Sequence, residues 1–341
     1  MKVLYIGDPH ITVAELADGA ALVDLVVKTA VQLKPDAIVF LGDQYHHHSI
    51  VHLEVMNFWL KALEHLVETT TAEIYLMVGN HDKPGSGRQD IHALLAHKDR
   101  HPRVHIVERP HRLIVPTIPM YTGVLLIPHQ DSGEEFLKLC SHFVSETKTV
   151  VCHQTFDGGR YENGFYAKDG VDPEKVPQPS ILSGHIHAPQ EFGKVWYVGA
   201  PRWRTTSDAN TERAIWLVEH DDTGAMVSRT AIDTGDVCRR ILDLEETEVG
   251  GLVVERYDTK KDDVRLTLKG PDFWLKAYGK MRKEQGFKVR TVCTDTKSAP
   301  RVRESEGIAP AFKKFVSAYK PKNNTPLPVL EKLVAERFAS V

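Results

Sequence analysis

Short apolar runs alternate with stretches of helical periodicity over the first 80 positions of the chain. The runs at 2–7, 36–41 and 73–78 have the length and composition of buried strands. Between them, 20–33 repeats apolar residues at helical spacing, and 51–67 is also expected to be a helix. Strand, helix, strand, helix at this spacing predicts βαβ units and a largely parallel sheet.

The middle of the chain has a looser pattern, with prolines between 104 and 132 that indicate short strands and turns. A helix is expected at 133–144, and a long polar loop is expected from 154 to 179. Further strands are expected where short apolar runs recur, at 148–152, 181–183, 194–198 and 212–218. The last two are predicted to close the sheet system.

The pattern changes again after about residue 238. Alternation at 264–268 predicts a half-buried strand, and it is followed by an expected helix at 271–285 and a strand at 288–292. Polar residues then lead to two short amphipathic segments, at 310–319 and 328–338. We therefore predict a large α/β domain, a smaller α/β domain and a helical tail, with the divisions at 1–238, 239–300 and 301–341.

Composition supports a protein with a full core, because 42% of its 341 residues are apolar. No apolar run approaches membrane-spanning length, and the first residues are too few for a signal peptide. Four scattered cysteines suit a reducing cytosol and argue against a disulfide framework or a thiolate zinc site.

The charge is unevenly distributed along the chain. Residues 1–238 hold 21 Lys and Arg against 31 Asp and Glu, whereas residues 239–341 hold 22 against 15. An acidic first part could hold cations and a basic second part could hold phosphates.

Three successive predicted strands end in glycine followed at once by a residue that can bind metal. These pairs are Gly7-Asp8, Gly42-Asp43 and Gly79-Asn80. Because the ends of parallel strands meet at one edge of a sheet, their side chains should lie together. Other histidines also follow predicted strands, so that the candidate ligands are Asp8, His10, Asp43, Asn80, His153, His185 and His187.

This mixture of carboxylate, imidazole and amide oxygen suits Mn²⁺, Fe²⁺ or Zn²⁺ better than Ca²⁺ or Mg²⁺ alone. Seven ligands are too many for one small ion, and a shared carboxylate, most simply Asp43, would hold two ions close together. Such a pair activates water and neutralises charge on phosphate oxygens. His81, beside Asn80, could contact the phosphate and protonate the leaving oxygen.

The series Asp8-x-His10, Gly42-Asp43, Gly79-Asn80-His81-Asp82, His153 and Gly184-His185-x-His187 resembles the calcineurin-like metallophosphoesterase family. The resemblance covers about residues 1–230 and implies a four-layer αββα sandwich. By that pattern, one ion is held by Asp8, His10, Asp43 and His187. The other is held by Asp43, Asn80, His153 and His185, and His81 is the catalytic histidine. We expect both ions to be Mn²⁺.

Within this superfamily the chain resembles the SbcD-like DNA repair nucleases and phage recombination endonuclease subunits. Gly42-Asp43-Gln44-Tyr45-His46 is similar to a family pattern whose histidine is linked to exonuclease activity, which implies a catalytic role for His46. The resemblance further implies DNA as substrate, a separate SMC-type coiled-coil ATPase as partner, and a homodimer within a heterotetramer. It implies a bacterial or phage-infected cytoplasm, a basic DNA-binding cap at 239–300, and partner-binding helices at 301–341.

Five cations are candidates for phosphate contact. They flank Trp203 in a loop or lie on the predicted helix of the cap: Arg202, Arg204, Lys280, Arg282 and Lys283. His47 and His48 are expected to be solvated, and His129 is expected to be a loop histidine. Gly158-Gly159-Arg160 could form a substrate loop.

Two other functions remain open from sequence alone. The same scaffold could be a phosphatase or small-molecule phosphodiesterase, although such an enzyme needs no basic cap of about 100 residues. A non-catalytic interaction scaffold is the third possibility, against which the complete ligand set and His81 argue.

Overall fold

The apolar runs at the start of the chain form the centre of a six-stranded sheet. The computed structural model describes residues 1–85, 90–116, 123–252 and 254–294. In strand order, the first sheet consists of β12 (Met226–Asp233), β11 (Ala214–His220), β1 (Lys2–Ile6), β2 (Ala37–Phe40), β3 (Glu73–Met77) and β4 (Val104–Val107). Strands β1 to β4 are parallel, as the βαβ pattern predicted, and β11 runs antiparallel to β1.

A second six-stranded sheet faces the first. Its order is β5 (His111–Arg112), β6 (Val124–Ile127), β7 (Thr149–Cys152), β8 (Ser180–Ser183), β10 (Val195–Tyr197) and β9 (Gln190–Phe192). Strands β6, β7, β8 and β10 are parallel and their residues are almost all buried. Because both faces of these strands are covered, they are continuous apolar runs rather than alternating ones.

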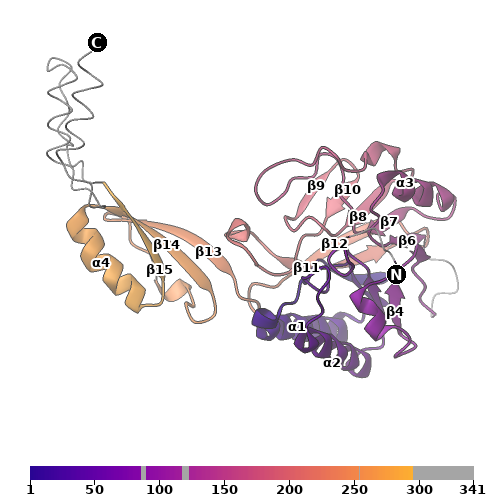
Figure 1. Cartoon of the computed structure of the whole chain (residues 1–341), viewed down its shortest axis with the longest axis horizontal. Coiled ribbons are helices and arrows are strands. Elements are labelled where there is room, and N and C mark those ends of the chain that lie inside the picture. Colours follow the sequence, from indigo (N-terminus) through magenta and orange to yellow (C-terminus); the bar gives the residue numbers. More distant parts are fainter. Residues whose placement is uncertain (86–89, 117–122, 253, 295–341) are drawn as a thin grey trace, which may run out of the picture.

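Three apolar layers hold the body together. Helices α1 (Leu16–Leu33) and α2 (Leu53–Thr69) pack on the outer face of the first sheet through residues such as Leu22 and Trp59. Val3, Tyr75 and Leu182 lie between the two sheets. Helix α3 (Gly133–His142) covers the outer face of the second sheet through Phe136 and Cys140. This order of helix, sheet, sheet and helix confirms the four-layer αββα sandwich (Figure 1).

A smaller α/β unit follows the sandwich and stands apart from it in Figure 1. Its parallel sheet has the order β13 (Ile241–Thr247), β14 (Asp263–Gly270) and β15 (Lys288–Cys293), and α4 (Asp272–Glu284) packs on one face. The buried guanidinium of Arg282 on α4 donates to Glu246 on β13 at 2.5 Å. Ile241, at the start of β13, belongs to the apolar core of the first sheet and so anchors the unit to the body.

Some expectations from the pattern were wrong in detail. The runs at 194–198 and 212–218 are strands as expected, but they lie in different sheets, because β10 joins the second sheet and β11 joins the first. Strands β12 and β13 were not expected, and α1 begins at Leu16 rather than near residue 20. Short 3-10 helices lie in loops, at Val13–Glu15, Ala93–His97, Pro173–Lys175, Thr206–Asp208 and Val254–Arg256. The helices expected at 310–319 and 328–338 lie outside the described residues.

Among the described residues, no helix is both long enough and apolar enough to cross a membrane.

Candidate metal centre

The seven predicted ligands lie at the carboxyl ends of strands from both sheets. Residues 8, 10, 43 and 80 follow β1, β2 and β3, and residues 153, 185 and 187 follow β7 and β8. Glycine is required where these ends converge: a Cβ at Gly79 would lie 2.1 Å from Oδ1 of Asp43, and one at Gly42 would lie 2.4 Å from Nδ1 of His153. The glycines that precede the ligands therefore let neighbouring side chains approach the backbone closely.

One group of ligand atoms surrounds the amide oxygen of Asn80. Its Oδ1 lies 2.8 Å from Nε2 of His153 and 2.9 Å from Nδ1 of His185. Those two ring nitrogens are 3.3 Å apart, and Oδ2 of Asp43 lies 3.3 Å from Nε2 of His153. These are the four residues that the family pattern assigned to one ion.

A second group adjoins the first through the same carboxylate oxygen. Oδ2 of Asp43 lies 3.4 Å from Nε2 of His10, which lies 2.9 Å from Nε2 of His187. Oδ1 of Asp8 is 3.3 Å from Nδ1 of His153. Asp43 is therefore placed to bridge two ions.

The donor set fits divalent cations by chemistry and by spacing. Two ligand atoms that are each about 2.1 Å from one ion lie about 3.0–3.4 Å apart at angles of about 90–109°. The separations within each group are close to this range. In addition, Oδ1 of Asp8 is buried without a hydrogen-bond partner among the described residues. Orphaned polar atoms of this kind indicate that the site is built for a bound ion.

The backbone is strained at three of the ligands. His10, Asp43 and His185 have φ angles of 45°, 53° and 81°, in the left-handed region that non-glycine residues seldom adopt. Each such residue costs of order 1–3 kcal/mol, and strain of this kind clusters at functional sites. The strained backbone therefore lowers the stability of the fold, and it directs these three side chains into the cluster.

Hydrogen bonds fix the orientation of the ligands. Nδ1 of His153 donates to the carbonyl of Leu41 at 2.9 Å, which leaves the lone pair of its Nε2 facing the cluster. The amide of His185 donates to Oδ2 of Asp8 at 2.9 Å, and the amide of His81 donates to Oδ1 of Asp43 at 2.8 Å. Each carboxylate thus keeps its second oxygen for the centre.

The electrostatic field of the centre favours positive charge. Burial alone would lower the pKa of His153, but the carboxylates of Asp43 and Asp8 raise it well above the usual value. Burial raises the pKa of Asp82 to about 7, with a further contribution from Asp43. The Asp82 carboxylate accepts from the amides of Gly79 and Tyr45, both at 2.9 Å, so it pins the turn that presents Asn80 and His81.

Histidines line the mouth of the centre. Nδ1 of His81 donates to the carbonyl of His46 at 2.6 Å, and the two rings are nearly parallel, with centroids 5.5 Å apart. Burial lowers the pKa of His81, an effect that Asp43 partly opposes. The ring of His48 stacks on His81 at 4.0 Å and its Nδ1 donates to the carbonyl of Asn80. His48 is exposed, as expected, although it also contacts His81 and Asn80.

His129, which was expected to be a loop histidine, lies near the centre. It follows β6, and its ring centroid lies 6.0 Å from those of His153 and His185. Burial, followed by the neighbouring His153, lowers its pKa to about 2. Its position after a buried strand, in Ile127-Pro128-His129, was the signal that could have identified it.

The two arginines that flank Trp203 have different roles. Arg202 is completely buried, and its guanidinium donates to the carbonyl of Pro9 and to Asp18. The prediction that Arg202 contacts DNA is wrong, because these internal acceptors occupy its donors. Arg204 lies at the mouth of the centre, where its charge contributes to lowering the pKa of His46. Its Nε is buried without a hydrogen-bond partner among the described residues.

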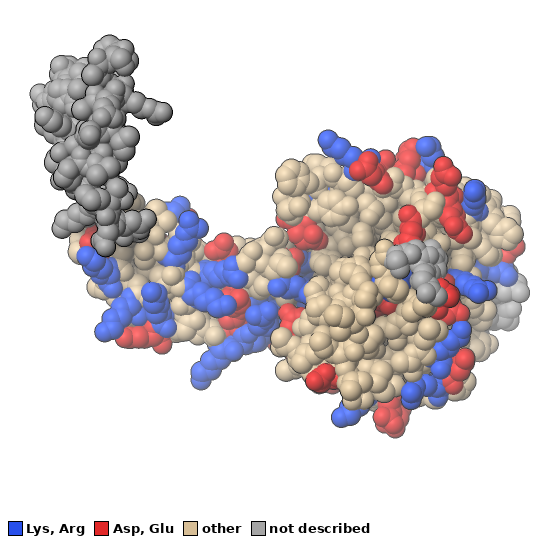
Figure 2. Space-filling model, in the orientation of Figure 1, with Lys and Arg blue, Asp and Glu red and all other residues tan. Residues whose placement is uncertain are grey.

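The cations of the cap lie on two faces rather than one. Lys276, Lys280 and Lys283 are exposed on α4, whereas Lys288 and Arg290 alternate with the β15 residues that face α4. Arg282 is buried against Glu246, so its predicted DNA contact is also wrong. Three more cations of this basic stretch, at 297, 301 and 303, lie beyond the described residues. Figure 2 shows Lys and Arg gathered over this part of the chain.

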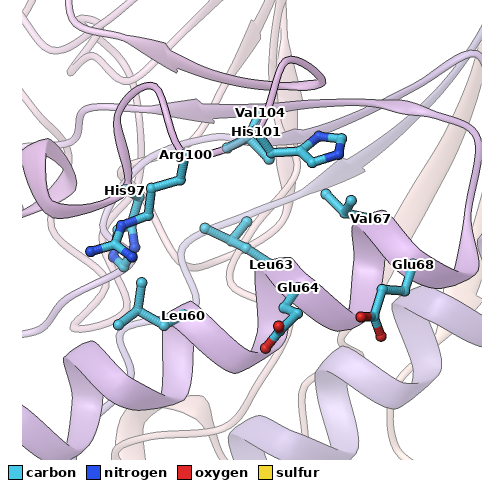
Figure 3. Close-up of a pocket in the computed structure, with 9 residues that line it drawn as sticks. All are labelled: Leu60, Leu63, Glu64, Val67, Glu68, His97, Arg100, His101 and Val104. Carbon is cyan, nitrogen blue, oxygen red and sulfur yellow. The ribbon is translucent and has the colours of Figure 1, made fainter.

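Among the hollows at the surface of the described residues, two are considered for the site. A groove of about 710 Å³ runs beside His46 and His47 and is lined by Arg204, Arg239 and Lys261 as well as by Glu15 and Asp18. A second hollow of about 470 Å³ lies between α2 and the segment before β4, away from the centre (Figure 3). Its lining residues are Leu60, Leu63, Glu64, Val67, Glu68, His97, Arg100, His101 and Val104.

Comparisons with known proteins agree with the chemistry of this centre. The family model described as calcineurin-like phosphoesterase matches residues 1–189. Exonuclease subunit 1 of Enterobacteria phage T4 is 24% identical over 232 residues, which cover 64% of this chain and 65% of the phage protein. Protein 078R of Invertebrate iridescent virus 3, which is named as a phosphoesterase, is 24% identical over 311 residues, or 85% of this chain and 83% of that protein.

Solved structures with a similar arrangement include a 5'-nucleotidase precursor from Thermus thermophilus. It is 13% identical, with a TM-score of 0.39 over 68% of this chain and 54% of that chain.

Proposed function

The chain belongs to the calcineurin-like phosphoesterase family, and on that premise we propose that it hydrolyses phosphodiester bonds of DNA with two divalent ions, as an exonuclease and endonuclease. It is a phosphoesterase of a family that uses divalent ions, and two clusters of its side chains could hold metal, namely Asp43, His153 and His185, and His10, His46 and His81. The observation that supports the proposal most is the groove that joins His46 at this centre to Arg239 and Lys261 near the cap. A small phosphate ester would not extend into such a groove.

The two ions would be held by Asp8, His10, Asp43, Asn80, His153, His185 and His187, and we propose Mn²⁺ for both. When bound, such a pair activates a water nucleophile and neutralises the charge that grows on the phosphate oxygens. Histidine and carboxylate ligands together are consistent with Mn²⁺ and also with Fe²⁺ or Zn²⁺.

The histidines at the mouth of the centre would transfer the proton to the leaving oxygen and position the substrate. The bond from Nδ1 of His81 to the His46 carbonyl orients the ring and uses its Nδ1 proton, so Nε2 must first take up a proton before it can give one to the leaving oxygen. His46 lies parallel to His81 and beside His10, at ring distances of 5.5 and 5.4 Å, where it can hold the strand against the centre. Arg204 adds a fixed positive charge for a non-bridging phosphate oxygen.

The groove would carry the DNA backbone beyond the cleaved bond. Arg204, Arg239 and Lys261 offer three cations along it, and Lys280 and Lys283 on α4 offer two more. Glu15 and Asp18 offset part of this charge, because Glu15 lies within 4.0 Å of both Arg204 and Arg239 and Asp18 pairs with Arg202. Backbone contacts of this type give affinity without sequence preference.

We also propose the biological setting that the resemblance implies. The enzyme would act in DNA recombination and double-strand-break processing in the cytoplasm, as a homodimer within a heterotetramer with an SMC-type coiled-coil ATPase. The name of the phage relative, an exonuclease subunit, is consistent with a partner protein, and the match spans 65% of that subunit.

The test compares Mn²⁺-dependent digestion of linear DNA with hydrolysis of p-nitrophenyl phosphate and its bis ester. We expect DNA and the bis ester to be cleaved and both activities to disappear on chelation. A chain that hydrolyses the monoester well and leaves DNA intact would instead be a phosphatase. A chain that binds metal but cleaves none of the three would be an interaction scaffold.

A further inference from the structure

A hydrogen-bonded hairpin projects from the second sheet beside the metal centre. The amide of Gly158 donates to the carbonyl of Ala167 at 3.1 Å, and the amide of Ala167 donates to Gly159 at 2.7 Å. Nearer the tip, the amide of Tyr161 donates to Phe165 at 2.8 Å. The base is packed on the sandwich, because a Cβ at Gly159 would lie 2.8 Å from Ile186. The segment expected to be a substrate loop is therefore an ordered hairpin.

Glu162 ties the tip of this hairpin to a metal-ligand loop. Its Oε1 accepts from the amides of His187 at 2.7 Å and Ala188 at 3.1 Å. A second clasp joins the hairpin to the same loop, since Gln190 exchanges two 2.7 Å hydrogen bonds with the backbone of Arg160. These hydrogen bonds fix the position of the hairpin relative to the loop that carries His187.

The hairpin exposes two neighbouring aromatic side chains. Phe165 is 72% exposed and Tyr166 is 61% exposed. In the described part of positions 1–238, every other Phe, Tyr and Trp side chain is buried or half-buried. Exposed apolar side chains that lie together and are rimmed by polar groups often mark a binding surface. Two exposed cations, Arg160 and Lys168, lie on the same hairpin, and the guanidinium of Arg160 reaches the tip at Gly164.

We propose that Phe165 and Tyr166 form a stacking platform for unpaired bases of the DNA strand that enters the centre. This inference rests on the proposed nuclease function and adds a substrate class, namely DNA ends with single-stranded nucleotides. Aromatic faces stack on any base, and adjacent cations contact the phosphates between them. The pair lies three to four positions from Glu162, which is hydrogen-bonded to the ligand loop.

Loss of one stacked base weakens single-strand binding by about 5- to 150-fold. The experiment measures kcat/KM with Mn²⁺ for Phe165→Ala, Tyr166→Ala and the double variant. Its substrates are duplex DNA with a single-stranded overhang, blunt duplex DNA and bis-p-nitrophenyl phosphate. Phe165→Trp keeps a stacking face, and Phe273→Ala removes an equally exposed ring, 71% exposed, from α4.

The proposal predicts that the alanine variants lose activity on overhang DNA, that blunt duplex is affected less, and that bis-p-nitrophenyl phosphate is hydrolysed as before. The Phe165→Trp variant should retain the preference for overhang DNA. The Phe273→Ala variant should show the same preference as the wild type. Unchanged overhang activity in the double variant would overturn the platform while leaving the nuclease function intact. An equal loss on all three substrates would also overturn it, because the hairpin would then only support the His187 loop.

Two other outcomes separate the alternatives. A wild-type chain that hydrolyses bis-p-nitrophenyl phosphate but no DNA would refute the nuclease function itself. Light scattering that shows a dimer for the wild type and a monomer for the double variant, with overhang activity unchanged, would assign the rings to a contact between copies.

Discussion

Gly79→Ala should disable the metal centre by one added methyl group. The backbone of Gly79 is not in the left-handed region, so alanine is conformationally allowed there. The added Cβ would nevertheless lie 2.1 Å from Oδ1 and 2.3 Å from the amide nitrogen of Asp43, against an ordinary contact of at least 3.4 Å. The carboxylate that bridges the two groups would therefore have to move by about 1.3 Å.

A displacement of that size has two consequences of different magnitude. Overpacking a buried site costs about 1–3 kcal/mol of stability, which a body of this size can survive. A catalytic group displaced by about 1 Å can cost on the order of 100-fold in rate. We therefore expect Gly79→Ala to remain folded, to bind Mn²⁺ more weakly and to lose at least about 100-fold in kcat/KM.

The assay combines circular dichroism melting, calorimetric titration with Mn²⁺ and hydrolysis of bis-p-nitrophenyl phosphate. Gly85→Ala is the matched control, because a Cβ at Gly85, six residues away, meets no atom within 4 Å. Wild-type metal affinity and activity in Gly79→Ala would refute the reasoning. Equal damage in Gly85→Ala would show that the effect is not local to the carboxylate.

Three further predictions concern catalysis, DNA binding and the tail. His81→Ala should abolish hydrolysis but keep metal and DNA affinity close to wild type, since His81 supplies a proton and a phosphate contact; loss of bound metal would contradict this. Replacing Lys276, Lys280 and Lys283 with Gln should weaken DNA binding uniformly across sequences. The slope of log K against log salt concentration should become less steep by up to about 2.7. An unchanged slope would show that these lysines are solvated surface residues. Deleting 326–341 should leave Mn²⁺-dependent nuclease activity intact and remove stimulation by an ATPase partner; unfolding or lost basal activity would place this segment in the core instead.

The strand-end ligands could be predicted because each signal is local in the sequence. A buried strand, a glycine and a ligand occur within a few residues, and parallel pairing then brings the ends of β1, β2 and β3 together. Strand β12 was missed because its side chains are mostly exposed and do not alternate between apolar and polar, and only pairing with β11 makes it a strand. The assignment of β10 and β11 to different sheets also depends on contacts between distant segments.

The roles of the arginines were not accessible to sequence reasoning. Arg202 and Arg204 are alike in a sequence, but a carboxylate 184 positions away pairs with the buried Arg202. Arg282 is buried by Glu246, 36 positions away on the neighbouring sheet. The position of His129 could not be read from the sequence for a related reason, because it approaches the centre through a loop whose course is set by tertiary contacts.

The most direct test of the account is the number of ions that the strand-end cluster holds. Elemental analysis of the chain equilibrated with saturating Mn²⁺ and freed of excess metal should give two ions per chain, because two groups of ligand atoms meet at one oxygen of Asp43. The same analysis on Asp43→Ala should give fewer. A wild-type value of one ion or less per chain would contradict the two-metal centre from which the proposed chemistry follows.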